Sequence, residues 1–173
     1  MDLKSTVRSI ANWPIEGVIF RDLTTLMKDP RAFAHACDLL YERYRPAKLD
    51  KVVGIDARGF VFGAVLAYRL GVGFVPVRKK GKLPAETEEE SYSLEYGSGT
   101  LEIHTDAIDP GERVVIVDDL IATGGTAGAT VQLVRRLGAV ILECAFLIEL
   151  PDLKGREQLK DCPVYAMMEF EGE

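Results

Sequence analysis

Two adjacent acids, Asp118 and Asp119, directly follow the apolar run 114–117 and precede a glycine-rich turn at 122–126. Such a run is typical of a strand covered on both faces of a parallel sheet. A turn that follows the carboxyl end of the strand and opens a helix offers several backbone N–H groups to a phosphate. The two carboxylates can accept hydrogen bonds from sugar hydroxyls. The pattern therefore predicts a site for a ribose 5-phosphate, held by Asp118, Asp119, Ala122, Thr123, Gly124, Gly125 and Thr126.

Other phosphate-binding motifs do not fit the sequence. It contains no G-x-x-x-x-G-K-[ST] segment, and residues 124–128 do not satisfy G-x-G-x-x-G, so nucleoside triphosphatase and dinucleotide-binding functions are not supported. A purely structural alternative is that the acids cap the helix and the glycines allow a tight turn. That alternative would be preferred for any single residue. The whole run in a strand, turn and helix context favours ligand binding instead.

The elements around this run alternate along the chain. A helix is predicted over 29–44, with Asp29 as its N-cap and Pro30 at the first helical position. Then come a strand at 51–55, a helix at 59–70 that ends at Gly71, and a strand at 73–77. The pattern resumes with a strand at 114–117, a helix at 125–137 and a strand within 140–150. This alternation predicts an α/β fold in which helices flank a central, mainly parallel sheet. The length of 173 residues suits a single domain.

The segment 79–99 differs from its surroundings. It is rich in Lys, Glu, Ser and Gly and shows little apolar periodicity. Long segments of this kind inside compact domains are usually functional or disordered. We therefore expect a mobile loop beside the predicted site, with the acids at 86–90 as solvated charge.

Composition narrows the classes of partner. A net charge of −6 argues against broad binding to nucleic acid or to an anionic membrane. The three cysteines show no metal-ligand spacing, and no segment is apolar and long enough to span a bilayer. We expect free thiols, no protein metal site, no nucleic-acid or membrane partner, and a cytoplasmic location.

The run 114–126 resembles the motif with which type I phosphoribosyltransferases bind 5-phosphoribosyl-1-pyrophosphate (PRPP). Segments 19–22 (IFRD), 54–60 (GIDARGF), 77–84 (VRKKGKLP) and 91–97 (SYSLEYG) are similar to those of the adenine phosphoribosyltransferases, in the same order. The resemblance covers nearly the whole chain. It implies that PRPP and adenine are converted to AMP and pyrophosphate, with a small N-terminal hood at 13–26 over the crevice.

Pyrophosphate leaves as negative charge builds, so the site needs cations and usually Mg²⁺, bound mainly through the pyrophosphate oxygens. Arg58, Arg78 and Lys82 follow strands and are candidates, although each alone is typical of a solvated surface charge. The resemblance further implies a cis peptide at Asp56-Ala57, a homodimer, and an Arg78 that acts across its interface.

For the base, Phe20 offers a face on which a purine can stack, and Leu120 could close the other side. The resemblance implies that backbone groups around Ile19 and Arg21 recognise adenine. Glu95 is the candidate for proton transfer, as an alternative to pyrophosphate itself or to a role as a solvated acid. Tyr96 is expected to help the loop close, which would exclude water.

Two other functions remain open from sequence alone. One is the same transfer to hypoxanthine, guanine, xanthine or orotate. The other is a regulatory protein that senses PRPP without catalysis. Relatives with other bases resemble this chain mainly in 114–126, and the catalytic candidate Glu95 favours an enzyme.

Overall fold

The computed structural model describes residues 1–94 and 97–172. The predicted site residues Glu95 and Tyr96 lie outside the described residues. Over the described residues, the main sheet has seven strands in the order β5-β6-β4-β3-β7-β8-β9. The parallel part consists of β4 (Gly73–Lys79), β3 (Lys51–Ile55), β7 (Arg113–Ile121), β8 (Val140–Glu149) and β9 (Val164–Glu169). The antiparallel strands β6 (Ser98–His104) and β5 (Thr87–Ser93) extend it beside β4.

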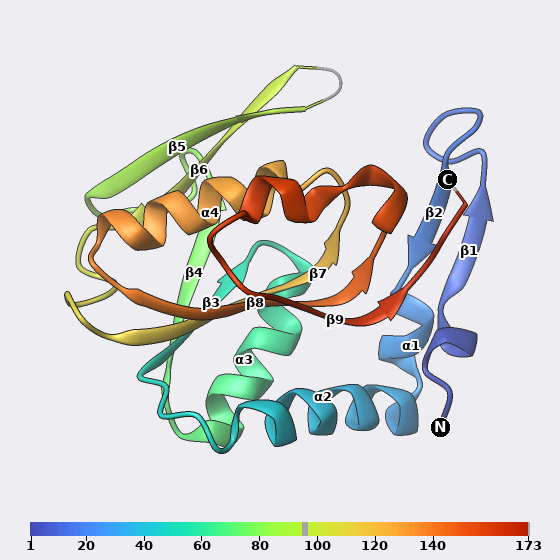
Figure 1. The fold of residues 1–173 in the computed structure, drawn as a ribbon, viewed down its shortest axis with the longest axis horizontal. Coiled ribbons are helices and arrows are strands. Elements are labelled where there is room, and N and C mark those ends of the chain that lie inside the picture. Colours follow the sequence, from blue (N-terminus) through green and yellow to red (C-terminus); the bar gives the residue numbers. More distant parts are fainter. Residues whose placement is uncertain (95–96, 173) are drawn as a thin grey trace.

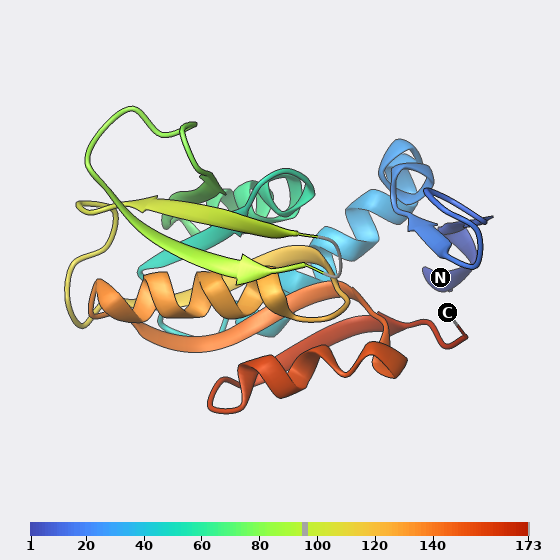
Figure 2. The same ribbon diagram turned by 90° about the horizontal axis from the view of Figure 1, so that it is seen from above.

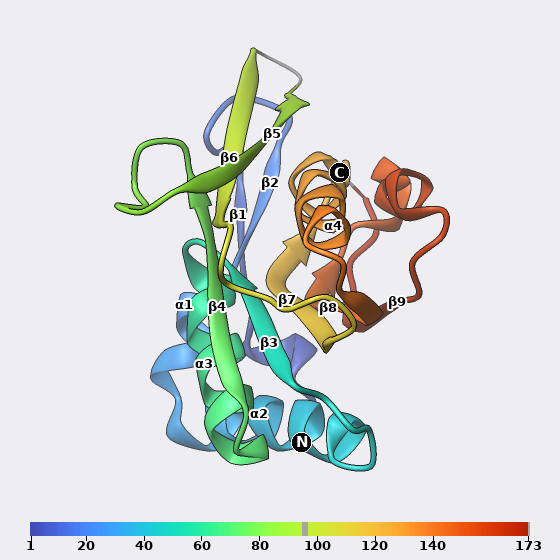
Figure 3. The same ribbon diagram turned by 90° about the vertical axis from the view of Figure 1, so that its left-hand side faces the viewer.

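Helices cover both faces of the sheet. One face carries α2 (Pro30–Tyr44) and α3 (Arg58–Leu70), and the other carries α4 (Gly125–Arg136), as Figure 3 shows. Alternate residues of β7 enter the two cores: Val115 and Val117 face the α2 and α3 side, whereas Val114 and Ile116 face the α4 side. Burial on both faces explains the continuous apolar run, and the predicted α/β fold is confirmed.

The helix ends follow the local signals. The Asp29 side chain accepts hydrogen bonds from the N–H groups of Arg31 and Ala32, 2.9 and 3.1 Å away, so the predicted cap is confirmed. Helix α3 ends at Gly71, whose φ of 69° lies in the left-handed region that favours glycine. None of the described helices combines the length and apolar character needed to cross a membrane.

The predicted hood (13–26) is part of a small antiparallel unit of β1 (Arg8–Ala11) and β2 (Ile19–Asp22), flanked by the 3₁₀ turn η1 (Lys4–Thr6) and by α1 (Thr24–Lys28). This whole unit, which begins before the predicted bounds, is called the hood below. Figure 1 shows it beside the C-terminal segment, at one end of the sheet. The carboxylate of Asp22 joins its parts, because it accepts hydrogen bonds from Arg8 and from the side chain and N–H of Thr24. These bonds lower the pKa of Asp22 to about 2.

The segment 79–99 contains more structure than its composition predicts. Strand β5 and the start of β6 lie within it and form a hairpin that runs along α4 (Figure 2). Two of the acids expected as solvated charge, Glu88 and Glu90, form ion pairs with Arg136 of α4. Their side chains remain 40% and 30% exposed, so they are solvated charges that also pair with a residue distant in the sequence. That this segment moves during the reaction stays a prediction.

The sequence pattern predicted no helix or strand after β8. This part of the chain forms the 3₁₀ turns η2 (Pro151–Leu153) and η3 (Gly155–Leu159) before the last strand, β9. Strand β7 also runs four residues beyond the predicted end at 117. Asp118 and Asp119 therefore lie within this strand rather than after it.

Candidate active site

Asp118 and Asp119 are buried near the end of β7, with 8% and 9% of their surfaces exposed. The first turn of α3 covers them. A Cβ atom on Gly59 would lie 2.7 Å from the carbonyl oxygen of Val117 and 2.9 Å from Oδ1 of Asp118, so glycine permits this close approach. The backbone N–H of Asp119 donates to Oδ1 of Asp118 over 2.8 Å.

The charges of the two acids are unequally compensated. Nε of Arg58 donates to Oδ2 of Asp119, forming an ion pair. Burial and the neighbouring charge of Asp119 raise the pKa of Asp118 well above its usual value. Hydrogen-bond donors or a cation brought by a ligand would favour the ionised form of Asp118. The pair is therefore suited to a ligand that carries hydroxyl groups.

The other two predicted cations, Arg78 and Lys82, lie at the end of β4 and in the turn that follows it. Nε of Arg78, on β4, donates to Oδ2 of Asp56 over 3.0 Å, and the peptide bond between Asp56 and Ala57 is cis, as predicted. Arg78 also donates to the backbone oxygen of Lys82 over 3.4 Å. The side chain of Lys82 is exposed, so the structure places it close to Arg78 without assigning it a contact of its own.

The turn from Ala122 to Thr126 is held from behind by η3. Gly124 has a φ of +84°, and a Cβ atom on it would lie 2.3 Å from the carbonyl oxygen of Gly155. A Cβ atom on Gly155 would in turn lie 2.4 Å from the carbonyl oxygen of Ala122. Residues far apart in the sequence thus fix the conformation of the turn. Gly155 was missed by the sequence analysis, because a lone glycine does not show what its backbone approaches.

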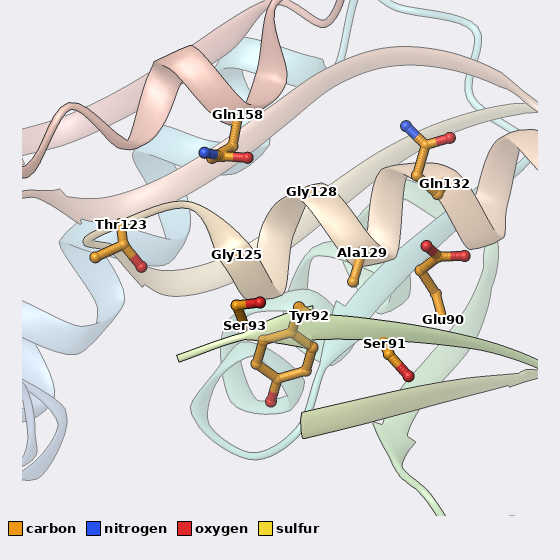
Figure 4. A pocket seen from close by; sticks show the side chains of 10 residues that line it. All are labelled: Glu90, Ser91, Tyr92, Ser93, Thr123, Gly125, Gly128, Ala129, Gln132 and Gln158. Atoms are coloured by element: carbon orange, nitrogen blue, oxygen red, sulfur yellow. The ribbon is translucent and has the colours of Figure 1, made fainter. Parts of the chain in front are cut away.

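A cavity of about 450 Å³ adjoins the turn. Figure 4 shows Thr123 and Gly125 on one side of it, Tyr92 and Ser93 of β5 on another, and Gln158 of η3 across from them. Its lining comes from the turn, the start of α4, the hairpin and η3. The hairpin and η3 residues are additions to the predicted site, and only their position next to the turn identifies them.

The hood carries Ile19, Phe20 and Arg21, which are predicted to contact the base. Phe20 is half-buried, and its ring meets the edge of Trp13 with the centroids 4.5 Å apart. Burial acts to lower the pKa of Arg58, but the charge and the hydrogen bond of Asp119 raise it, and the charges of Asp118 and Asp22 add to the rise. Ile19 lies on β2, and Leu120 of β7 is partly buried against the core on the α2 and α3 side.

The side chain of Arg21 packs against the C-terminal segment. It lies 4.8 Å from the centre of the Phe170 ring and donates to Oγ of Ser9 and to the backbone oxygen of Glu171, over 2.6 and 3.2 Å. Its Nε is buried without a hydrogen-bond partner. Only the backbone of Arg21 remains a candidate for contact with a base.

Comparison with known proteins decides the family. Residues 22–170 match the model of the phosphoribosyl transferase domain. An adenine phosphoribosyltransferase from Desulfosudis oleivorans is 65% identical over 173 residues, which is all of both chains. This chain belongs to the adenine phosphoribosyltransferase family.

Solved structures of the adenine phosphoribosyltransferase family have the same fold. The enzyme from Thermoanaerobacter pseudethanolicus has a TM-score of 0.94 and 48% identity, with 98% of each chain covered. The Saccharomyces cerevisiae enzyme, in complex with an imino-altritol bisphosphate and adenine, has a TM-score of 0.91 and 45% identity, with 96% of this chain and 97% of that chain covered.

The described residues do not form a metal-binding site of their own. No group of three or more His, Cys, Asp or Glu side chains among them could hold a metal ion. The buried carboxylates of Asp118 and Asp119 nevertheless fit a divalent cation that arrives with a ligand, since Mg²⁺ commonly binds through one or two carboxylates plus phosphate oxygens.

Proposed function

We propose that this chain transfers the 5-phosphoribosyl group of PRPP to adenine, giving AMP and pyrophosphate. Membership of the adenine phosphoribosyltransferase family supports the choice of base. The observation that carries the proposal is the burial of Asp118 and Asp119 directly before the turn that opens α4. A ligand with vicinal hydroxyls and a phosphate matches both features.

The ribose and its phosphate are proposed to bind at the end of β7. The two ribose hydroxyls donate to Asp118 and Asp119, and each charge-assisted bond contributes about 1.5–3 kcal/mol. The 5-phosphate accepts from the N–H groups of the turn and from the hydroxyls of Thr123 and Thr126. The half charge at the N-terminus of α4 adds to this attraction. These contacts fix C1 of the ribose in the crevice.

In the transfer, the bond from C1 to the pyrophosphate oxygen breaks and the bond from C1 to N9 of adenine forms. Arg58 and Arg78 are proposed to stabilise the charge on the departing pyrophosphate, with Lys82 approaching from the turn after β4. Mg²⁺ held mainly by PRPP, with Asp118 and Asp119 beside it, would neutralise part of this charge. Arg58 already contacts Asp119, so its side chain links the ribose and pyrophosphate regions.

Adenine is proposed to lie under the hood. Phe20 and Leu120 are the candidates to cover its two faces, and backbone groups of Ile19 and Arg21 to bind its polar edge. The proton released from N9 is accepted by the Glu95 carboxylate in this proposal, with pyrophosphate as the alternative acceptor. Tyr96 is proposed to help the loop close over the ligands, which protects the ribosyl centre from water.

We also propose a cytoplasmic homodimer in which Arg78 reaches the partner's site. The support is the resemblance of segment 77–84 to the family, together with free thiols at all three cysteines. Sedimentation of the protein gives the oligomeric state. A monomer with full activity would contradict the role of Arg78 across an interface.

The test of the function is product formation from a panel of bases. PRPP and Mg²⁺ are supplied with adenine, hypoxanthine, guanine or orotate, and nucleotide and pyrophosphate are both measured. We expect AMP and pyrophosphate in equal amounts from adenine, and much less product from the other bases. Equal turnover of a 6-oxopurine would overturn the choice of adenine, and no turnover of any base would overturn the enzyme assignment.

A further inference from the structure

Cys144 and Cys162 face each other on the α4 side of the sheet. Their Sγ atoms are 3.4 Å apart, and both residues are buried. Cys144 lies in the middle of β8, whereas Cys162 lies in the short connection between η3 and β9. A disulfide bond is about 2.05 Å long, so the two sulfurs need to approach by about 1.4 Å to form one.

The two thiols differ in access. Cys144 is fully buried, whereas Cys162 is 7% exposed and lines a cavity of about 320 Å³ together with Arg135 and Gln158. Arg135 donates to the backbone oxygen of Asp161, next to Cys162, over 3.2 Å. The hydrogen bond with Cys144 and the charge of Arg135 lower the pKa of Cys162, whereas the pKa of Cys144 is raised. Cys162 is therefore the thiol that can react first.

The segment that ends at Cys162 also supports the phosphate-binding turn. The N–H of Cys162 donates to the backbone oxygen of Leu159, the last residue of η3, over 2.9 Å. At the other end of η3, Gly155 meets the turn so closely that a Cβ atom on Gly124 would lie 2.3 Å from its carbonyl oxygen. Gln158 of η3 faces the cavity beside Thr123 and Gly125 (Figure 4). One short 3₁₀ segment thus connects Cys162 to the contacts that support the turn.

We propose that Cys162 and Cys144 form a reversible disulfide with each other when the protein reacts with a low-molecular-weight disulfide. We propose further that this bond weakens the binding of PRPP. The Cys162 thiolate attacks one sulfur of the small disulfide, forming a mixed disulfide and releasing one small thiol. The Cys144 thiol then loses its proton to the solvent and attacks Sγ of Cys162, which releases the second small thiol. The two cysteines are oxidised by two electrons, and the small disulfide is reduced to two thiols.

Disulfide formation should weaken PRPP binding because only one of the two sulfur atoms is free to move. Cys144 is fixed by strand pairing on both sides, because β8 lies between β7 and β9. Cys162 lies in the connection and makes most of the approach, drawing the end of η3 toward β8. The close contacts between Gly155 and the turn leave no room for this shift, so the N–H groups of the turn are displaced. A misplacement of about 1 Å can cost on the order of 100-fold in a positioned site.

The test uses the full chain and oxidised glutathione. After treatment, the unfolded protein is alkylated and its disulfides are mapped by mass spectrometry, and PRPP with Mg²⁺ is titrated into folded samples. We expect a bond between Cys144 and Cys162, a free Cys37, and PRPP affinity lowered by about tenfold or more and restored by dithiothreitol. Cys162→Ser should abolish the bond and the loss of affinity, whereas Cys37→Ser should keep both.

Three results would overturn the proposal. They are the absence of the bond, a stable glutathione adduct on Cys162 with Cys144 still free, and a complete bond without any change in PRPP affinity. The effect on affinity depends on the proposed function, but the disulfide map does not. An untreated protein that binds no PRPP would therefore refute the proposed function and leave the cysteine chemistry to be judged by the map.

Discussion

Replacing Asp118 by Asn should stabilise the protein, and increasingly so as the pH rises. The folded protein holds the proton of Asp118 more tightly than the unfolded chain, because burial and the charge of Asp119 raise its pKa well above 3.8. The unfolded chain therefore releases this proton at lower pH, and the parent loses stability as the pH rises from about 4 through the raised pKa. Asn has no such proton, and its oxygen can still accept from the N–H of Asp119.

The size of the effect follows from the pKa shift. Each pKa unit corresponds to about 1.4 kcal/mol, and in a domain of this size 1 kcal/mol changes Tm by about 2–4 °C. Asp118→Asn should therefore raise Tm at pH 7.5 by about 3–6 °C for each unit by which the pKa of Asp118 is raised, with little change near pH 4. Differential scanning calorimetry without ligand, from pH 4 to 8, measures this difference. The matched variant Asp119→Asn should gain less, because it loses the ion pair with Arg58. A difference in Tm that does not depend on pH would refute the reasoning.

Two further substitutions test the supports of the site. Gly155→Ala should weaken PRPP binding about tenfold or more, because its Cβ would lie 2.4 Å from the oxygen of Ala122. The matched variant is Gly128→Ala, in which the nearest contact of the new Cβ would be 3.5 Å. In calorimetric titration this variant should bind PRPP like the parent. Arg21→Lys should raise KM for adenine about threefold or more and leave the PRPP dissociation constant unchanged, because Lys loses the stack on Phe170 and the planar fork that joins hood and C-terminal segment. Thermal unfolding of Gly155→Ala must show a folded protein for its loss of PRPP affinity to count. In Arg21→Lys, an equal loss of both substrates would contradict the proposed split.

Local signals in the sequence predicted the elements that they control. Asp29 with Pro30 and the left-handed Gly71 act within one helical turn, so the start of α2 and the end of α3 were predicted correctly. The continuous apolar runs likewise predicted the parallel strands, because both faces of the sheet are covered.

Features that depend on distant partners could not be read from the sequence. The hairpin strand β5 is polar, and it is stabilised by pairing with β6 and by the ion pairs of Arg136. The support that Gly155 gives to the turn and the approach of Cys144 to Cys162 likewise join segments that only the fold brings together. The sequence motif indicated which residues form the candidate site, whereas the burial of the acids and the position of η3 required the structure.

Calorimetric titration of the double variant Asp118→Asn with Asp119→Asn is the most direct test of the proposal that the acid pair binds the ribose of PRPP. The substitutions remove charge and keep shape, so thermal unfolding should show a folded protein at least as stable as the parent at neutral pH. Affinity for PRPP with Mg²⁺ should fall by at least about tenfold, because the loss of about 1.4 kcal/mol already gives that factor. A folded double variant that binds PRPP as tightly as the parent would contradict this account.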